Sequence, residues 1–426
     1  MPTTEWRVCK LDELGSVGRG KSRHRPRNDE SLYGGDYPFF QTGDIKAASF
    51  HLTDYSQTYN EKGLAQSKLW QPGTLCITIA ANIAETAILG IPGCFPDSVV
   101  GFVPDAGKTD VQFIKYYVDT IKLQMQSVSR GTTQDNLSVD KLLSFDFCVP
   151  PLPVQRRIAG ILSAYDELIE NNQRRIRILE DMARSLYREW FVHFRYPGHE
   201  SVPLADSPLG QIPQGWEVKK LGDVAATFRG RSYRSVDLAD EGGVPFLNLK
   251  CLDRDGGFRR SGLKRYVGEF KETHLAKKGD IVMAVTDMTQ ERRIVARAAL
   301  VPSLDNEFGV FSMDLVRIEP KCEVPKSFLY SFFRYSSFAD EVKQHANGAN
   351  VLHLSPERIT DFRFSVPPVD LMERFVRFVA PTLERMDVLQ NQTANLRRTR
   401  DLLLPRLLSG QLVLSEMEAK LDEVMP

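Results

Sequence analysis

The segment Phe145-Asp-Phe-Cys-Val-Pro-Pro-Leu152 recurs later in the chain as Phe362-Arg-Phe-Ser-Val-Pro-Pro-Val369. Before each copy the chain reads as short mixed elements. After each copy, apolar residues follow one another at intervals of three and four, which is typical of a helix. Each Val-Pro-Pro is therefore predicted to close a folded module and to lead into a long helix.

Three further landmarks recur in the same order. Because four landmarks in register are hard to obtain by chance, the chain is predicted to be a tandem duplication. The three pairs are Trp6-Arg-Val-Cys-Lys-Leu-Asp-Glu-Leu-Gly15 with Trp216-Glu-Val-Lys-Lys-Leu-Gly-Asp-Val-Ala225, Tyr37-Pro-Phe-Phe-Gln-Thr-Gly-Asp-Ile45 with Val244-Pro-Phe-Leu-Asn-Leu-Lys-Cys-Leu252, and Trp70-Gln-Pro-Gly-Thr-Leu-Cys-Ile77 with Ala276-Lys-Lys-Gly-Asp-Ile-Val-Met283.

Each copy is predicted to be a compact module of mixed secondary structure. Residues 75–79 and 280–285 read as buried strands, each introduced by a Gly turn. Residues 111–128 and 326–344 have helical spacing. The predicted fold class is α+β, as a tandem duplication of a mixed α/β domain and a long helix.

The two long helices are predicted to pack on each other. Some 40 residues at about 1.5 Å each would give a rod of roughly 60 Å, well above the mean globular helix. Pro381 and Pro405 should kink or break the second helix, and Gly410 suits its end. The alternative is an amphipathic helix lying on its own module. The predicted apolar seams are Ile158, Ile161, Tyr165, Leu168, Asn172, Ile176, Leu179, Ala183, Leu186 and Trp190 in the first helix, and Phe375, Phe378, Leu383, Met386, Leu389, Leu396, Leu403 and Leu407 in the second.

Composition limits the classes of protein to consider. Lys and Arg number 55, as do Asp and Glu, so the formal net charge is zero and any nucleic-acid binding must come from local clusters. Six cysteines without C-x-x-C spacing argue against a zinc ribbon or a disulfide framework. The first ten residues lack a signal-peptide layout, and no apolar run reaches membrane-spanning length. A reducing, cytoplasmic location is expected.

The strongest local cluster of charge is a Gly-rich loop. Gly15-Ser-Val-Gly-Arg-Gly-Lys-Ser22 matches a nucleotide-binding pattern, but a polar segment precedes it and no good helix can follow, so a P-loop is rejected. A basic Gly loop at both copies favours binding to DNA phosphates or guanine, and a solvated loop is the alternative. The candidate cations are Arg19, Lys21, Arg23, Arg25 and Arg27 in the first copy, and Arg229, Arg231 and Arg234 in the second.

Other polar loops supply further candidates for contact with DNA. Asn and Gln can pair with adenine, although in Gly turns they usually cap the backbone. These candidates are Gln41, Thr42, Lys46, Thr132, Thr133 and Gln134 in the first copy, and Asn248, Lys250 and Asn350 in the second. Residues 286–293 form another polar loop at a strand end.

The sequence gives no catalytic or metal-binding pattern. An Asn/Asp-Pro-Pro-Tyr/Phe motif, which adenine methyltransferases use, is lacking, because both Pro-Pro pairs follow a valine. The seven histidines have no metal-ligand spacing. No catalytic residue and no metal site is predicted.

Taken together, these residues resemble the specificity subunit of type I restriction-modification enzymes over essentially the whole chain. The resemblance rests on the duplication, the Gly-Thr-Thr-Gln134 stretch, both Val-Pro-Pro closures with their helices, and the terminal Leu402-Leu-Leu-Pro-Arg-Leu-Leu-Ser-Gly-Gln-Leu412. It implies target-recognition domains at 1–150 and 201–366 and spacer helices at 151–200 and 367–426, packed as an antiparallel coiled coil.

In function, the resemblance implies a non-catalytic subunit whose two domains each read half of a bipartite target in double-stranded DNA. The helices would set the gap and dock two modification subunits. S-adenosylmethionine would belong to the modification subunit, and ATP and Mg²⁺ to restriction subunits, with no cofactor on this chain. The second basic loop is weaker than the family pattern. The alternatives to this function are a single-chain DNA methyltransferase or nuclease and a two-lobed protein scaffold. The sequence does not reveal which DNA sequence is the target.

Overall fold

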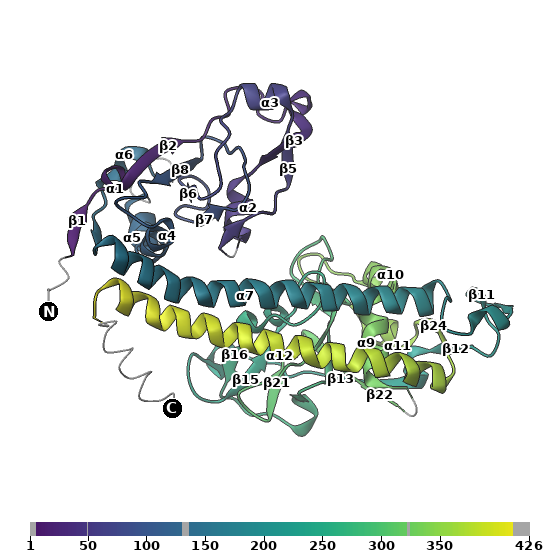
Figure 1. Cartoon of the computed structure of the whole chain (residues 1–426). Coiled ribbons are helices and arrows are strands. Elements are labelled where there is room, and N and C mark those ends of the chain that lie inside the picture. The colour runs from purple at the N-terminus through teal and green to yellow at the C-terminus, as the bar shows by residue number, and fades with distance from the viewer. Residues whose placement is uncertain (1–5, 49, 130–135, 322–323, 412–426) are drawn as a thin grey trace, which may run out of the picture. The chain divides into compact units, whose positions relative to one another are not determined.

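The structure, a computed structural model, describes residues 6–48, 50–129, 136–321 and 324–411. The chain forms two compact units, one of residues 1–173 and 392–426 and the other of residues 174–391. Each unit therefore contains one copy of the duplicated module together with part of each long helix (Figure 1).

The first unit is built around a five-stranded sheet in the order β2-β8-β6-β7-β4. Its opening and closing landmarks meet, because β1 pairs antiparallel with β9 and Val8 lies opposite Cys148. The elements of its module are β1 Arg7–Cys9, α1 Leu11–Leu14, β2 Gly15–Arg19, β3 Tyr33–Phe39, α2 Thr42–Ala47, β4 His51–Leu52, β5 Gln57–Tyr59, α3 Glu61–Ala65, β6 Leu75–Thr78, β7 Thr86–Leu89, β8 Val99–Pro104, α4 Val111–Thr120, α5 Lys122–Ser129, α6 Val139–Ser144 and β9 Phe147–Val149.

The second unit has a four-stranded sheet, β13-β22-β18-β20, and a five-stranded sheet, β14-β16-β15-β21-β17. Here too the outer landmarks pair, β12 with β24. Its module contains β10 Leu204–Ser207, β11 Gly210–Pro213, β12 Glu217–Lys220, α8 Leu221–Val224, β13 Ala225–Arg229, β14 Leu238–Ala239, β15 Val244–Leu247, β16 Lys264–Tyr266, β17 Leu275–Lys277, β18 Ile281–Ala284, β19 Thr286–Asp287, β20 Ala298–Leu300, β21 Phe308–Phe311, β22 Leu315–Pro320, α9 Lys326–Tyr335, α10 Phe338–Val342, β23 Leu352–His353, α11 Pro356–Thr360 and β24 Arg363–Val366.

The shared sheet confirms the predicted duplication and α+β class. The order β2-β8-β6-β7 in one unit corresponds to β13-β22-β18-β20 in the other. The two predicted buried strands are β6 and β18, and all their residues are buried. Each predicted helix of the modules is present as two shorter helices, α4 with α5 and α9 with α10.

The two long helices are α7, Leu152–Tyr187, and α12, Val369–Leu408. In the first unit the start of α7 shares a core with the end of α12, through Ile158 and Leu407. In the second unit the segment just past α7 meets the start of α12, where the rings of Trp190 and Phe375 are 6.0 Å apart. Within each unit the segments are therefore antiparallel (Figure 1).

Two expectations about the second helix have different outcomes. Pro381 and Pro405 do not break α12, which is a correction to the sequence prediction. Both prolines are exposed, so water can satisfy the carbonyl groups that lose their intrahelical partner. Gly410 follows the helix with a φ of 71°, which confirms its predicted helix-ending role.

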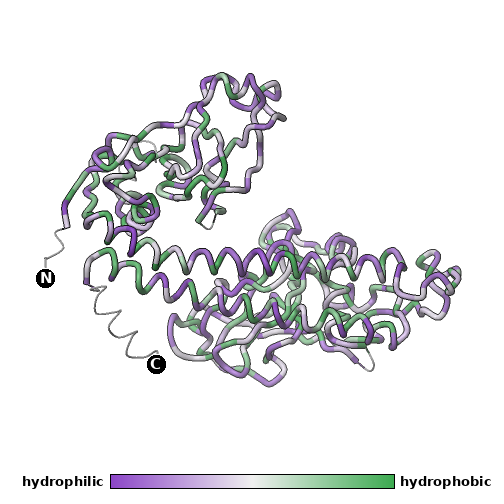
Figure 2. Tube along the Cα trace, in the orientation of Figure 1, coloured by the Kyte–Doolittle hydropathy of each residue, from purple (hydrophilic) through white to green (hydrophobic). Residues whose placement is uncertain are grey.

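The buried face of the helices differs in part from the predicted seam. Leu168 and Phe378 were predicted to be buried but are 51% and 62% exposed. Instead Leu162 and Asp166 are buried, because α7 also packs against the module of its own unit. Figure 2 shows hydrophobic residues throughout both modules and alternating hydropathy along both helices.

Candidate nucleic-acid interface

The predicted basic loops lie at equivalent points of the two modules. In the first unit the chain leaves β2 through Gly20, and the N–H of Lys21 donates to the carbonyl of Phe95 at 3.1 Å. In the second unit it leaves β13 through Gly230, and the N–H of Arg231 donates to the carbonyl of Phe311 at 2.8 Å. The two loops therefore begin with the same backbone geometry.

Glycine is required at both points because the backbone approaches another segment closely. A Cβ atom at Gly20 would collide with the carbonyl oxygen of Pro96, and one at Gly230 with that of Ser312. The Gly residues of the sequence motif thus serve the packing of a loop against its sheet. The motif is not followed by a helix that could hold a nucleotide, since the next helical element is the short Glu30–Leu32.

All five cations of the first loop are exposed, but they differ in their partners. The Nη2 of Arg27 donates to both carboxylate oxygens of Asp97, each at 2.8 Å. Arg19 donates to the Asp97 carbonyl, and Arg25 donates to the carbonyls of residues 22 and 24. Among the described residues, the side chains of Lys21 and Arg23 have neither an ion pair nor a hydrogen bond, so their charges are the most available for phosphate.

Residues that the sequence analysis missed hold this loop in place. The side-chain oxygen of Gln66 accepts the backbone N–H groups of Arg23, at 2.5 Å, and His24, at 3.0 Å. His24 contacts Asp29 at 2.7 Å, and hydrogen bonds from Ser31 and His24 lower the pKa of Asp29 to about 2. Gln66 lies far from the loop in sequence, and nothing in its local pattern marks it.

The second loop carries fewer available charges. Arg229 is exposed, whereas the Nε of Arg231 donates to the hydroxyl of Tyr266 at 3.4 Å. That hydrogen bond raises the pKa of Arg231. Arg234 is largely exposed and lies 3.8 Å from Asp237. This arrangement fits the weaker basic character that the sequence indicated.

The candidates that follow β3 sit at the start of α2. Gln41 is the residue before the helix, and its side chain donates to Gln57 at 2.7 Å. Thr42 is the first residue of α2 and is half-buried. Lys46, near its end, is exposed and donates to the Asn82 side chain at 3.2 Å, beside the loop that follows β6. Their contact with DNA stays a prediction.

In the second module, Asn248 and Lys250 occupy different environments. Asn248 is 7% exposed, caps the short helix Leu249–Cys251 and donates to the carbonyl of Gly262 at 3.3 Å. Its amide therefore serves the fold, which is the capping role that Asn often has in turns. Lys250 is exposed at the surface.

The last group of candidates falls on the loops that precede the closing strands. Thr132, Thr133 and Gln134 lie outside the described residues. Asn350 is exposed in the turn that leads into β23. This turn lies against the loop 286–293, since the Nε2 of Gln290 donates to the carbonyl of Ala349 at 2.9 Å.

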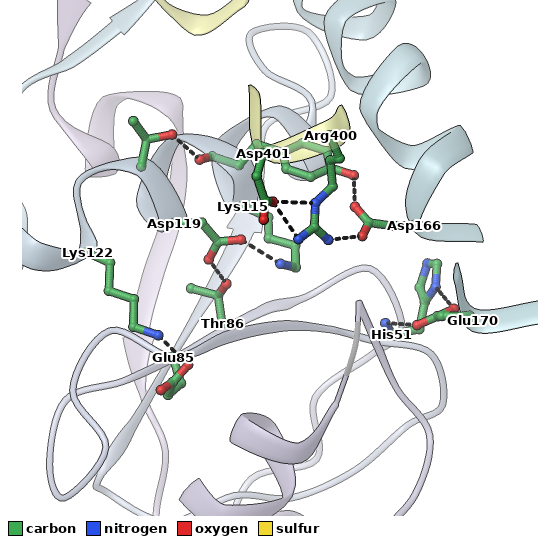
Figure 3. A network of polar contacts seen from close by, with 12 residues as sticks. His51, Glu85, Thr86, Lys115, Asp119, Lys122, Asp166, Glu170, Arg400 and Asp401 are labelled. Atoms are coloured by element: carbon green, nitrogen blue, oxygen red, sulfur yellow. Dashed lines mark hydrogen bonds and ion pairs between the residues drawn. The ribbon is translucent and has the colours of Figure 1, made fainter. Parts of the chain in front are cut away.

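A network of polar contacts joins the first module to the helices within its unit (Figure 3). Asp166 of α7 is 2% exposed and accepts hydrogen bonds from the Tyr116 hydroxyl, at 2.5 Å, and from Arg400 of α12. Burial and the Asp166 carboxylate raise the pKa of Tyr116. Nearby, Glu170 accepts from His51, whose pKa is raised mainly by that hydrogen bond. The module is thus anchored to α7 by two carboxylates, and α12 binds one of them through Arg400.

The second unit has a corresponding anchor. Asp387 of α12 accepts from Arg260 and from Ser303, each at 3.0 Å. Arg334 of α9 donates to Glu180 of α7 and is itself largely buried. In the second unit, therefore, α7 and α12 each contribute a carboxylate that fixes the module. In the first unit the carboxylate comes from α7, and Arg400 of α12 binds the same carboxylate.

Two other classes of site can be assessed over the described ranges. Within them, no three His, Cys, Asp or Glu side chains come together as a possible metal site. In the same part of the chain, none of the helices combines the length and apolar character that crossing a membrane requires.

Comparison with known proteins identifies relatives of the whole chain. The type I restriction modification DNA specificity domain matches residues 3–181 and 213–395. The MjaIX and MjaVIII type I restriction enzyme specificity subunits of Methanocaldococcus jannaschii are 25% and 21% identical, covering 97% and 96% of this chain and 95% and 93% of theirs. A crystal structure of a type-I restriction-modification system S subunit from M. genitalium has the same fold, with a TM-score of 0.63 at 16% identity over 96% of this chain and 97% of that one. With two matches that together span most of its length, each covering one copy of the module and much of the long helix that follows it, this chain belongs to the type I restriction modification DNA specificity family.

Proposed function

We propose that this chain is the DNA-specificity subunit of a type I restriction-modification complex and that each module reads one half of a bipartite target in double-stranded DNA. The observation that carries this proposal is the pair of equivalent basic loops after Gly20 and Gly230, each held by the same backbone hydrogen bond in a duplicated module. Cations at equivalent points of two modules suit contact with two stretches of DNA backbone.

The long helices would set the distance between the half-sites and dock two modification subunits. Exposed apolar side chains along them support this part of the proposal. On α7, Leu168, Ile178 and Met182 are 51%, 50% and 60% exposed, and on α12 Phe378 and Leu402 are 62% and 63% exposed. Apolar residues exposed along a helix are suited to packing against helices of another subunit.

In this assignment the chemistry resides in other subunits. The modification subunits would bind S-adenosylmethionine and methylate the target, and restriction subunits would use ATP and Mg²⁺. This chain would bind no cofactor and would have no catalytic residues of its own. It would act in the cytoplasm, where the target DNA is located.

Methylome sequencing of a host with and without this chain tests the proposal. We expect one bipartite methylated motif to disappear when the chain is removed. An unchanged methylome would contradict the proposal. Crosslinking of a methyl donor to the isolated chain would favour a single-chain methyltransferase, and absence of salt-sensitive DNA binding with partners supplied would favour a protein scaffold.

A further inference from the structure

The loop that follows β18 distinguishes the second module from the first. In the first module the N–H of Ala84 donates to the carbonyl of Thr78 at 2.8 Å, so residues 79–83 join β6 to the next segment. The equivalent bond in the second module joins Ala296 to Ala284 at 2.9 Å, across residues 285–295. The two sheets are thus the same at this point, while the second carries a longer connection.

A buried carboxylate closes this longer loop. Asp287 is 3% exposed, and its Oδ1 accepts the N–H and the hydroxyl of Thr289, at 2.8 and 2.9 Å. Its Oδ2 accepts the N–H of Ile294 at 2.9 Å. Although burial opposes ionisation, these backbone hydrogen bonds lower the pKa of Asp287 below its usual value. The two ends of the loop are therefore tied to one side chain.

A second segment supports the loop from the side. β19 and β23 pair antiparallel, with Thr286 opposite His353. The turn before β23 is closed by hydrogen bonds between the backbones of Asn347 and His353, at 3.0 and 2.9 Å. Gln290 reaches this turn and donates to the carbonyl of Ala349 at 2.9 Å. The loop and the turn thus form one ordered ridge, which we define as residues 288–293 with 347–350.

The tip of the ridge is exposed although its base is ordered. Residues 288–291 and 347–350 are exposed, and Met288 is 68% exposed. An ordered loop that presents its side chains to solvent is typical of a binding element, because its conformational entropy is already lost before binding. Asn350 has the amide that can pair with adenine, and Met288 can contact the methyl group of thymine.

We infer that this ridge is the base-reading element of the second module, with Met288 and Asn350 contacting base edges and Asp287 acting as a positioning residue. The inference rests on the proposed function and adds to it the segment that determines one half of the target. It also gives a reason for the difference between the modules: two copies of one sheet read different half-sites because the connections at the same strand end differ.

The experiment uses the full chain, co-expressed with its modification subunits in a host without the system, followed by methylome sequencing. Met288→Ala and Asn350→Ala should relax one half-site at one or two positions, with a loss of discrimination of roughly fivefold to 150-fold at each. The other half-site and the gap should stay unchanged. Val267→Ala, at a 52% exposed residue of the same module, is the control and should leave the motif as it is.

The variant Asp287→Asn tests whether Asp287 positions the ridge for contact with bases or only stabilises the fold. It should relax the same half-site while the salt dependence of DNA binding stays that of the wild type. An unchanged motif in both Met288→Ala and Asn350→Ala, beside a bipartite wild-type motif, would overturn the inference and leave the proposed function intact. Changes in both half-sites would also overturn it. A wild type without any bipartite methylation would overturn the proposed function, and this inference with it.

Discussion

Single polar residues decide how each module is attached to the helices. In the first unit the buried carboxylate of Asp166 accepts from Tyr116 of α4 and from Arg400 of α12, so that one side chain joins three elements. A buried charge is stable only when it is paired and hydrogen-bonded, and removal of one partner leaves the others unsatisfied. Asp166 is therefore a sensitive position in the first unit.

Replacement of Asp166 by Ala is expected to lower the free energy of unfolding of the first unit by about 1–3 kcal/mol, because the buried hydroxyl of Tyr116 would lose its acceptor and the half-buried Arg400 would keep only Asp401 as a partner. Urea denaturation of the full chain measures this change. The control is Asp401→Ala, which removes a 61% exposed partner of the same guanidinium and should cost less than about 1 kcal/mol. Equal losses in the two variants would show that Asp166 is not the anchor.

At the scale of elements, α7 and α12 are continuous helices whose segments contact each other in both units. Asp166 faces Arg400 in one unit, and Trp190 lies beside Phe375 in the other. Each unit fixes its own antiparallel pairing of the two helices, so a change of length in one helix alone would alter the number of residues between the two sets of contacts in that helix and not in the other. Any test of the helices as a spacer must therefore lengthen both.

Duplication of residues 169–175 in α7 together with residues 384–390 in α12 should lengthen the recognised gap. One heptad adds about 10 Å of helix, which corresponds to about three base pairs. Methylome sequencing of the co-expressed complex measures the gap, and both half-sites should be unchanged. Duplication in α7 alone is the matched control and should abolish methylation. A changed half-site in the double variant would contradict the role of the helices as a spacer.

For the whole molecule, the balance of 55 basic and 55 acidic residues means that no overall field draws it to DNA. Affinity must then come from local clusters, and in the first loop Lys21 and Arg23 are the cations whose side chains have neither an ion pair nor a hydrogen bond among the described residues. Binding that rests on a few such charges depends on salt through the phosphates that they contact.

Charge reversal at Lys21 and Arg23 is expected to weaken binding to every DNA sequence and to flatten the salt dependence, by roughly 0.9 in slope for each phosphate that the loop no longer neutralises. Titration of the assembled complex with duplex DNA at several salt concentrations measures the slope. Lys108→Glu, at an exposed lysine of the same unit, is the control. A slope equal to that of the wild type would exclude this loop from the DNA surface.

Sequence reasoning recovered the elements of the fold better than the details of the candidate interface. The strands β6 and β18 and the helices α7 and α12 have strong local periodicity, and the structure contains all four. The prediction failed where burial depended on a distant neighbour: Leu168 fits the helical seam but is exposed, and the polar Asp166 is buried on the same helix. The spacing of apolar residues within one helix does not show which of its faces the module covers.

By itself, the sequence determined that this protein is a duplication of an α+β module and a long helix. The reason is that the repeated motifs and the helical spacing of apolar residues depend only on the order of residues in the chain. Only the tertiary structure decided which side chains hold the candidate loops in place. Gln66 fixes the first basic loop and Asp287 closes the ridge of the second module, through hydrogen bonds that depend on position in space. The physical reason is that a buried polar group needs partners, and those partners come from segments that only folding brings together.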